Sequence, residues 1–304
     1  MSLINRRAFL QTSSAALVCG STLFRATPLN ATPLGLPLGL QLYSVRDLLP
    51  HDFAGTLKQI AALGYQEVEA AGYYHHSVGE VRTALRDAGL RLPSAHYSHD
   101  DLSRDFDQIL TFNKELGVHT LICSFPGLKS PSRLKSPSFA TLVQSFTLED
   151  WRWNADEFNR MGRKVKAAGM QFGYHNHTME FRPQQGVVPY DLLMRRTDPE
   201  LVTFEMDCGW VKVGGGNPVT YLERYPARIT MLHVKDFKKT NMPVSVASPP
   251  PPAELGRGTE DYRPIFAAAS KANIKHCFVE QEGFDMPPMQ ALKIDAEYMR
   301  SFKA

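Results

Sequence analysis

The chain has 304 residues and a formal net charge of +3, with 34 Lys and Arg against 31 Asp and Glu. Residues 1–31 contain three of the arginines and no acidic residue, so the rest of the chain has 31 basic and 31 acidic side chains. Such a neutral chain has no basic excess to attract nucleic acid or an anionic membrane, which argues against both as partners.

The N-terminal residues predict an export signal. The segment NRRAFLQ resembles the twin-arginine motif, and a short apolar stretch from Ala15 to Phe24 follows it. Because that stretch is too short to span a bilayer, we expect cleavage near Ala31 and no membrane anchor in the mature protein. Residues 1–31 are therefore predicted to be a twin-arginine signal peptide, and the mature protein is predicted to be periplasmic. The alternative is an arginine pair in an untargeted tail.

After this segment, short apolar runs alternate with helical patterns along the chain. One helical pattern ends at Gly64, as a C-cap glycine predicts, and another begins with the capping residues Thr147 and Asp150. Strands are predicted at 38–45, 65–71, 90–96, 118–125, 171–177, 202–210, 229–237 and 275–282. Helices are predicted at 52–64, 78–90, 106–117, 147–169, 217–226, 262–274 and 289–302.

Two longer segments interrupt this alternation. Residues 126–146 are rich in Pro, Ser and Lys, and residues 241–259 contain four consecutive prolines, Pro249–Pro252. Loops of this length in a compact domain are usually lids, binding loops or oligomer contacts. We expect both loops to determine specificity, and a homo-oligomer is one of the alternatives that they leave open.

Eight strands that alternate with helices predict parallel βαβ units. With right-handed crossovers, eight such units close into a (β/α)8 TIM barrel, an α/β fold. We expect a single domain over residues 35–304, because no long Ser/Gly linker divides the chain. A doubly wound open sheet is the alternative, but no GxGxxG turn follows an early strand. The run Gly214–Gly216 lacks that strand-to-helix context and is interpreted as a loop.

Polar groups that bind metals stand at or near the ends of four predicted strands. They are Glu180, Asp207, His233 and Glu280. Because the carboxyl ends of parallel barrel strands meet at one mouth, these four side chains are expected to converge there. Carboxylates combined with a histidine suit a divalent cation such as Mn²⁺, Zn²⁺ or Co²⁺. The sequence therefore predicts a divalent metal site at the mouth of the barrel.

Each of these residues also has a purely structural interpretation. Asp207 precedes Gly-Trp and is suited to cap a helix, and His233 alone suits a hydrogen-bonded core histidine. Glu282 lies on the same strand face as Glu280, so either is a candidate ligand. The three cysteines beyond residue 31 form no CxxC pair, and we interpret them as small buried residues rather than as disulfide or zinc-binding residues.

The segments GLQLYSVRD, GYQEVEAAGYY, SAHY, GYHNHTMEF, MDCGW, LHVKD, ELGRGT and VEQE follow one another in this order. Together they resemble the sugar-phosphate isomerase/epimerase family of xylose-isomerase-like TIM barrels. The resemblance covers nearly all of the chain after residue 31. It implies a divalent metal held by residues from strands five to eight, with Asp207, His233 and Glu280 in the last three places. Glu180 is preferred for the first place because oxygen donors suit such a site, and His175 is the alternative.

The resemblance also implies a reaction. A metal of this kind polarises a sugar carbonyl and the adjacent hydroxyl, so that a carboxylate can remove the proton between them and give a cis-enediolate. Glu180 and Glu280 are the expected acid and base. Lys235 is expected to stabilise the enediolate oxygen, with a surface ion pair to Asp236 as the alternative. Further candidate contacts to the sugar are His96, His175, His177, Glu69, Tyr43 and Trp210, with Glu69 and Tyr43 otherwise supporting His96.

The expected activity is isomerisation or epimerisation of a free or 3-keto sugar or glycoside, because export argues against sugar phosphates. The same site can also drive β-elimination, which would make the protein a lyase or dehydratase. A non-catalytic carbohydrate-binding barrel is a third alternative. Metal-assisted cleavage of DNA, as in the AP endonuclease relatives, expects a basic groove, which the neutral chain does not provide.

Overall fold

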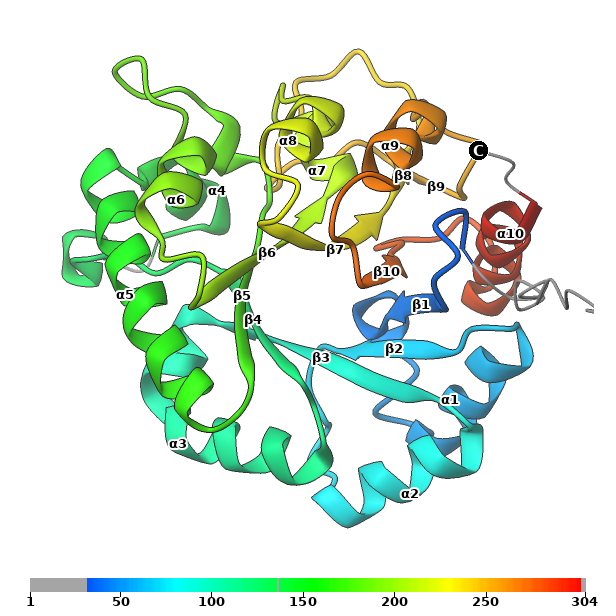
Figure 1. Cartoon of the computed structure of the whole chain (residues 1–304). Helices are drawn as coiled ribbons and strands as arrows, with labels where there is room; N and C mark the ends of the chain where they lie inside the picture. Colours follow the sequence, from blue (N-terminus) through cyan, green and yellow to red (C-terminus); the bar gives the residue numbers. More distant parts are fainter. Residues whose placement is uncertain (1–31, 136, 302–304) are drawn as a thin grey trace, which may run out of the picture.

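The structure is a computed structural model that describes residues 32–135 and 137–301. The predicted signal peptide at 1–31 lies outside these residues. Eight parallel strands close into a barrel in the order β1-β10-β7-β6-β5-β4-β3-β2, with helices around the outside (Figure 1). The predicted (β/α)8 fold is confirmed. The barrel strands are β1 (Leu38–Gln41), β2 (Glu67–Ala70), β3 (Arg91–Ser98), β4 (Thr120–Phe125), β5 (Gln171–His175), β6 (Val202–Asp207), β7 (Ile229–Val234) and β10 (His276–Val279).

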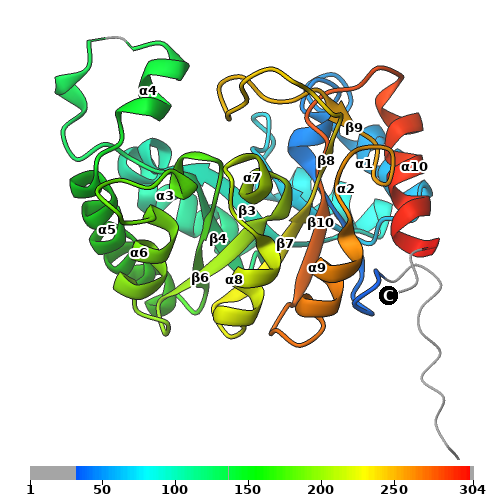
Figure 2. The ribbon, with the colours of Figure 1, turned by 90° about the horizontal axis from the view of Figure 1, so that it is seen from above.

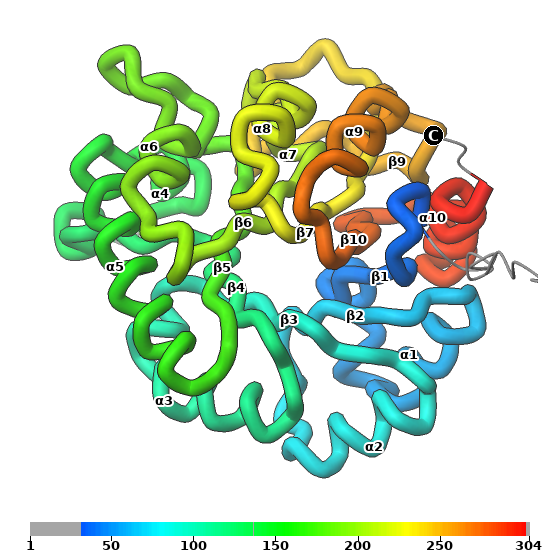
Figure 3. The backbone as a smooth tube through the Cα atoms, viewed as in Figure 1, coloured from blue at the N-terminus to red at the C-terminus, as the bar shows by residue number. Residues whose placement is uncertain are grey.

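The first and last strands of the barrel pair where it closes. Strand β1 pairs in parallel with β10, with Leu38 opposite Cys277, and the tube in Figure 3 shows these two strands side by side. A short antiparallel pair, β8 (Asp236–Phe237) and β9 (Pro252–Ala253), lies outside the barrel. The α-helices are α1 (Phe53–Ala62), α2 (Val78–Ala88), α3 (His99–Leu116), α4 (Phe139–Ser145), α5 (Leu148–Ala167), α6 (Pro189–Arg196), α7 (Cys208–Val213), α8 (Pro218–Arg224), α9 (Tyr262–Ala269) and α10 (Pro288–Ser301).

Local sequence explains where these elements begin and end. The predicted capping pair of α5 is present, because Thr147 and Asp150 each accept a backbone hydrogen bond from the other. Helix α3 begins seven residues earlier than predicted, because Ser98 caps it by accepting a hydrogen bond from the Asp101 N–H. Three predictions were wrong in detail. Residues 42–45 form the 3-10 helix η1 rather than strand, residues 208–210 are helical, and α6 was not anticipated.

The interior of the barrel is filled below the mouth by a small apolar cluster. It consists of Ile122, Met231 and Phe278, from strands that are not all neighbours, and it is separate from the main core. Two glycines make room for it. A Cβ atom on Gly39 would lie 2.4 Å from the Phe278 ring, and one on Gly173 would lie 2.5 Å from Ile122. The barrel is therefore packed at this level, and open space can exist only above it, towards the strand ends.

The two long loops rise on the same end of the barrel (Figure 2). The 126–146 loop contains the 3-10 helix η2 (Pro131–Arg133) and α4, and it is tied to α5 by Arg133, whose guanidinium donates to both oxygens of Asp150 at 2.8 Å. The carboxylate of Asp236 organises the other loop. It accepts hydrogen bonds from four backbone N–H groups between Gly256 and Glu260, at 2.9 to 3.2 Å.

The described residues include no membrane-spanning helix, and their cysteines form no disulfide. None of their helices combines the length and apolarity needed to cross a membrane. Cys123, Cys208 and Cys277 are free and buried, which confirms their interpretation as small core residues. Burial raises the pKa of all three thiols, because it disfavours the thiolate. These cysteines are therefore unreactive parts of the core.

Candidate metal centre

Four side chains from successive strand ends converge at the mouth. His175 ends β5, Asp207 ends β6, His233 lies on β7, and Glu280 directly follows β10. Each is buried, and one potential ligand atom from each lies within 4.8 Å of the others. Three of the residues that were predicted to converge therefore do so in the structure, namely Asp207, His233 and Glu280.

The predicted ligand Glu180 does not belong to this group. It lies in the 3-10 helix η3 (Met179–Phe181), and its Oε1 accepts hydrogen bonds from the Tyr174 hydroxyl at 2.5 Å and from the His177 N–H at 3.1 Å. This carboxylate closes the turn after β5, so it does not fold back towards the other ligands. The structure instead gives the fourth place to His175, which was the alternative.

Asp207 combines a structural and a site role. Its Oδ1 accepts a hydrogen bond from the Trp210 N–H at 2.8 Å and so caps α7, as the structural interpretation predicted. Its Oδ2 is buried and has no hydrogen-bond partner, although the Lys235 ammonium lies 3.2 Å away. Burial raises the pKa of Asp207 to about 6 in spite of that ammonium. A buried carboxylate oxygen that is left over in this way suits a cation ligand.

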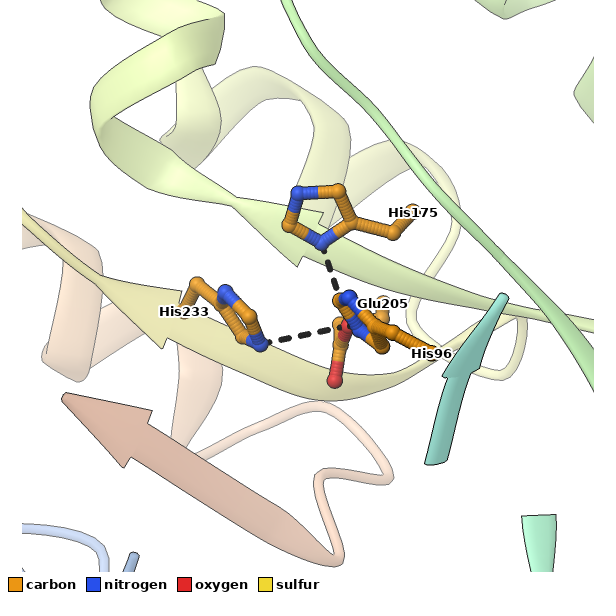
Figure 4. A group of neighbouring side chains, drawn as sticks. All are labelled: His96, His175, Glu205 and His233. Carbon is orange, nitrogen blue, oxygen red and sulfur yellow. Dashed lines mark hydrogen bonds and ion pairs between the residues drawn. The ribbon is translucent and has the colours of Figure 1, made fainter. Parts of the chain in front are cut away.

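A second layer of polar side chains lies directly beneath. Figure 4 shows Glu205 of β6 surrounded by His96, His175 and His233. The Glu205 Oε2 atom lies 2.6 Å from His96 Nε2, 3.1 Å from His175 Nδ1 and 3.2 Å from His233 Nε2. With its Nδ1 engaged below by Glu205, the Nε2 atom of His175 remains for a ligand above. Carboxylates in this position fix the ring orientation and tautomer of metal-binding histidines.

Glu69 and Gln41 complete this lower layer. Glu69 Oε1 lies 2.8 Å from His233 Nε2 and 2.9 Å from His96 Nε2, and it accepts a hydrogen bond of 2.7 Å from the Gln41 amide. Two roles were predicted for Glu69, contact with the sugar or support of His96. Because Glu69 is fully buried and contacts His96, the structure favours support of His96. Gln41 and Glu205 were missed. Their positions inside apolar runs concealed them, although Glu205 lies two residues before Asp207 and hence on the same strand face.

The two layers set the charges of the histidines. Burial disfavours charge on His96, but the carboxylates of Glu69 and Glu205 outweigh burial and raise its pKa to about 9. The pKa of His233 is raised in the same way, against burial and mainly by Glu205. Burial dominates for His175 and lowers its pKa well below the usual value, so this imidazole is neutral and available as a ligand.

Lys235 is part of the site and not a surface residue. Its ammonium is buried and lies 2.7 Å from Glu280 Oε2, and it also contacts the Glu282 carboxylate and the face of the Trp210 ring. The alternative ion pair with Asp236 is wrong, because that carboxylate is occupied by the backbone of the 256–260 segment. Burial opposes the charge of Lys235, but the surrounding carboxylates outweigh it and raise the pKa.

A cavity of about 760 Å³ opens from this cluster. Of the predicted substrate contacts, His96, His175, His177 and Tyr43 line it, together with Glu280 and Glu282. Trp210 does not line the cavity. It is 1% exposed and packs against Phe237 with ring centroids 5.1 Å apart, because α7 turns it into the protein. The prediction of Trp210 as a wall for the sugar ring is therefore wrong.

The residues of the upper layer fit a divalent cation. Two carboxylates and two imidazoles are a donor set that suits Mn²⁺, Zn²⁺ or Co²⁺, and the Oδ2 atom of Asp207 has no hydrogen-bond partner. Glu205 and Glu69 supply the supporting hydrogen bonds that such histidines need. A second group, formed by His96, His175, Glu205 and His233, also lies within ligand distance. It shares two histidines with the first, and we interpret Glu205 as their support.

Residues 57–302 match a protein family described as xylose isomerase-like TIM barrel. Among curated relatives, inosose dehydratase from Clostridium beijerinckii is 27% identical over 193 residues, which are 61% of this chain and 64% of that enzyme. The alignment thus spans less than two thirds of that relative's length. The inosose dehydratase from Geobacillus thermodenitrificans is 25% identical over 82% of this chain and 89% of its own length.

Solved structures share the fold. A sugar phosphate isomerase/epimerase from Parabacteroides distasonis superposes with a TM-score of 0.68 at 26% identity, over 87% of this chain and 94% of that protein. The similar proteins thus include a dehydratase and an isomerase/epimerase on one type of barrel.

Proposed function

This chain belongs to the xylose isomerase-like TIM barrel family, and we propose that it is a divalent-metal-dependent sugar isomerase or epimerase. The observation that carries the proposal is the convergence of His175, Asp207, His233 and Glu280 beside Lys235, next to a cavity that His175 and Glu280 line. The substrate class is a free or 3-keto sugar or glycoside, and the reaction begins with removal of a proton next to a carbonyl.

The four converging residues would hold the cation. When bound, a divalent cation supplies polarisation of a ketone and its neighbouring hydroxyl, which acidifies the C–H bond between them. Asp207 and Glu280 contribute two negative charges to this site, and the two histidines contribute none when they act as neutral ligands.

Proton transfer falls to the groups that line the cavity. Glu280 and Glu282 face it from the β10 side, and the Lys235 ammonium lies between them and can stabilise an oxyanion that develops there. His96 faces the cavity from β3 and holds a proton at neutral pH, since its pKa is about 9. We propose that a carboxylate of the β10 side removes the proton and that His96 is the donor to the developing oxyanion or carbon. Glu180, which does not line the cavity, has no part in this scheme.

Dehydration is the second candidate. It is favoured by the curated relatives, which are named inosose dehydratases and include one aligned over 89% of its length. Removal of the same proton followed by loss of a β-hydroxyl gives elimination instead of isomerisation. Protonated His96 would then assist departure of the hydroxyl, so the same residues serve either outcome.

We also propose that the reaction occurs in the periplasm after export, on a small-molecule sugar and without nucleic acid. The neutral charge of residues 32–304 supports the absence of a nucleic-acid partner. A carbohydrate-binding protein without catalysis would not require the layered support of both histidines by Glu205 and Glu69, and this support favours an enzyme.

The test is metal analysis of the purified protein, followed by NMR in D₂O with Mn²⁺ and a panel of free and 3-keto sugars. We expect about one divalent ion per chain and deuterium at a single carbon. Retention of every hydroxyl identifies an isomerase or epimerase, and an enone or diketone product identifies a dehydratase. Sugar binding without deuterium uptake or product would refute both. A Glu280→Gln variant is the control, because it removes a predicted metal ligand while preserving shape.

A further inference from the structure

The cavity extends well beyond the metal centre. Its volume of about 760 Å³ lies in the upper part of the range for drug-sized ligands, about 300–1,000 Å³. A single sugar ring at the metal centre therefore leaves a large part of the space unfilled. Besides Tyr43, five tyrosines and phenylalanines line the cavity, and we call the part that they line the aromatic arm. Its residues are Tyr73, Tyr97, Phe112, Phe125 and Phe139.

Helix α3 lines this arm along one face and is kinked near its middle. Asp105 has non-helical angles, φ −126° and ψ 28°, which divide the helix into two segments. Residues on both sides of the kink, including Arg104 and Phe112, line the cavity. Phe139 of α4 and Val246 of the 241–259 loop also line the cavity. The two long loops therefore each contribute an apolar side chain to the arm.

Two of the aromatic rings are held in place by one buried amide. Asn113 accepts a hydrogen bond from the Tyr73 hydroxyl at 2.7 Å and donates one to the Tyr97 hydroxyl at 2.7 Å. Asn113 itself is fully buried, and the Tyr73 ring packs against Phe112 with centroids 4.8 Å apart. With their hydroxyls engaged, these tyrosines offer the ligand mainly the faces and edges of fixed rings.

Charge excludes an anionic group from the arm. Arg104 is the only Lys or Arg among the described residues that line the cavity, and its guanidinium is paired with Asp101 and Asp105 at 2.7 Å each. Glu280 and Glu282 add further negative charge at the metal end. A phosphate or carboxylate bound in the arm would find no free cation there and would face two aspartates.

We propose that the aromatic arm binds an uncharged apolar or aromatic aglycone, so that the substrate is a neutral glycoside rather than a free sugar or a sugar phosphate. The sugar end of this assignment rests on the proposed function. A second sugar ring is the competing occupant, because Ser98, Gln108 and Ser124 also line the cavity, and a disaccharide is therefore included in the test.

The test compares binding of methyl and phenyl 3-keto-D-glucopyranosides by calorimetry with the Mn²⁺-loaded protein. We expect the phenyl compound to bind more tightly. Phe139→Ala removes a ring that is half exposed, so the fold should tolerate the change. It should weaken phenyl binding by about 2- to 12-fold, the value of one aromatic contact, and change methyl binding by less than about 2-fold. Phe112→Ala should act in the same direction. Met242→Ala, an exposed apolar residue outside the cavity lining, is the matched control and should change neither.

Equal binding of the two glycosides, unaffected by Phe139→Ala, would overturn the proposal. So would a 3-keto disaccharide that binds more tightly than the phenyl glycoside. Deuterium exchange on the same compounds separates this proposal from the proposed function. Tighter binding of the phenyl glycoside without deuterium exchange would support the aglycone site and refute the proposed enzymatic function. Deuterium exchange without tighter binding of the phenyl glycoside would support the enzymatic function and refute the aglycone site.

Discussion

Glu180→Gln distinguishes the two assignments of the strand-five ligand. Burial raises the pKa of Glu180 from 4.5 to about 7, despite the hydrogen bonds from Tyr174 and the His177 backbone. Between these two pH values the folded protein holds a proton that the unfolded chain has released. The stability of the wild type therefore falls as the pH rises from 4.5 to 7, and the loss is complete above 7. A shift of this size corresponds to about 3 kcal/mol.

The amide of the Glu180→Gln variant can accept the same two hydrogen bonds without ionising. We therefore expect the variant to equal the wild type at pH 4.5 and to exceed it by up to about 3 kcal/mol at pH 9. The assay is urea unfolding of the metal-free proteins across this range. In the metal-loaded proteins, Glu180→Gln should retain the cation. A variant that is less stable at pH 9 would show that our interpretation of the turn is wrong, and a variant that loses its metal would show that Glu180 is a ligand.

Four other predictions follow from contacts at the mouth and in the two long loops. His175→Ala should reduce the metal content well below one ion per chain in elemental analysis, and Glu205→Gln should weaken metal affinity by about 10- to 100-fold while leaving the ligands in place. Asp236→Ala should destabilise the protein by at least about 3 kcal/mol in urea unfolding, because it leaves four loop N–H groups without their acceptor. Burial raises the pKa of Asp150, but hydrogen bonds from Arg133 and Thr147 outweigh burial and lower this pKa to about 2. The ionised carboxylate therefore stabilises the folded protein fully above about pH 4. This stabilisation should be lost as the pH falls through 2, and Asp150→Asn should abolish this dependence in acid unfolding.

The strand ends were predictable because the physical signal is local. An apolar run that stops at Asp207 or Glu280 shows from sequence alone that the chain has reached the rim of the sheet. The barrel then brings distant rims together, which is why three of the four converging residues could be predicted. The family resemblance added the order of the ligands, and it left the choice between Glu180 and His175 open.

The errors have a common cause, which is that sequence does not show where a chain turns. Trp210 was expected in the cavity, but the cap at Asp207 starts α7 immediately and carries the indole into the protein. Glu180 follows β5 by five residues, and the direction of its carboxylate is set by hydrogen bonds from Tyr174 and the His177 N–H, which the sequence does not reveal. Glu205 was not predicted as a site residue, because it lies within an apolar run. The sequence alone does not show whether the carboxylate of such a residue points into the barrel.

His175 takes the place that was predicted for the carboxylate of Glu180. This difference moves the negative charge of the site more than it changes the amount of that charge. Glu205 lies 3.1 Å below His175, so the site keeps an anion on the same side, one layer deeper. A cation in the upper layer would thus meet a nitrogen donor whose basicity is increased by a carboxylate behind it. Nitrogen donors favour Zn²⁺, Co²⁺ or Mn²⁺ over Mg²⁺, which prefers oxygen ligands and retains its waters. The buried carboxylates of the lower layer would therefore contribute to metal selectivity without being ligands themselves.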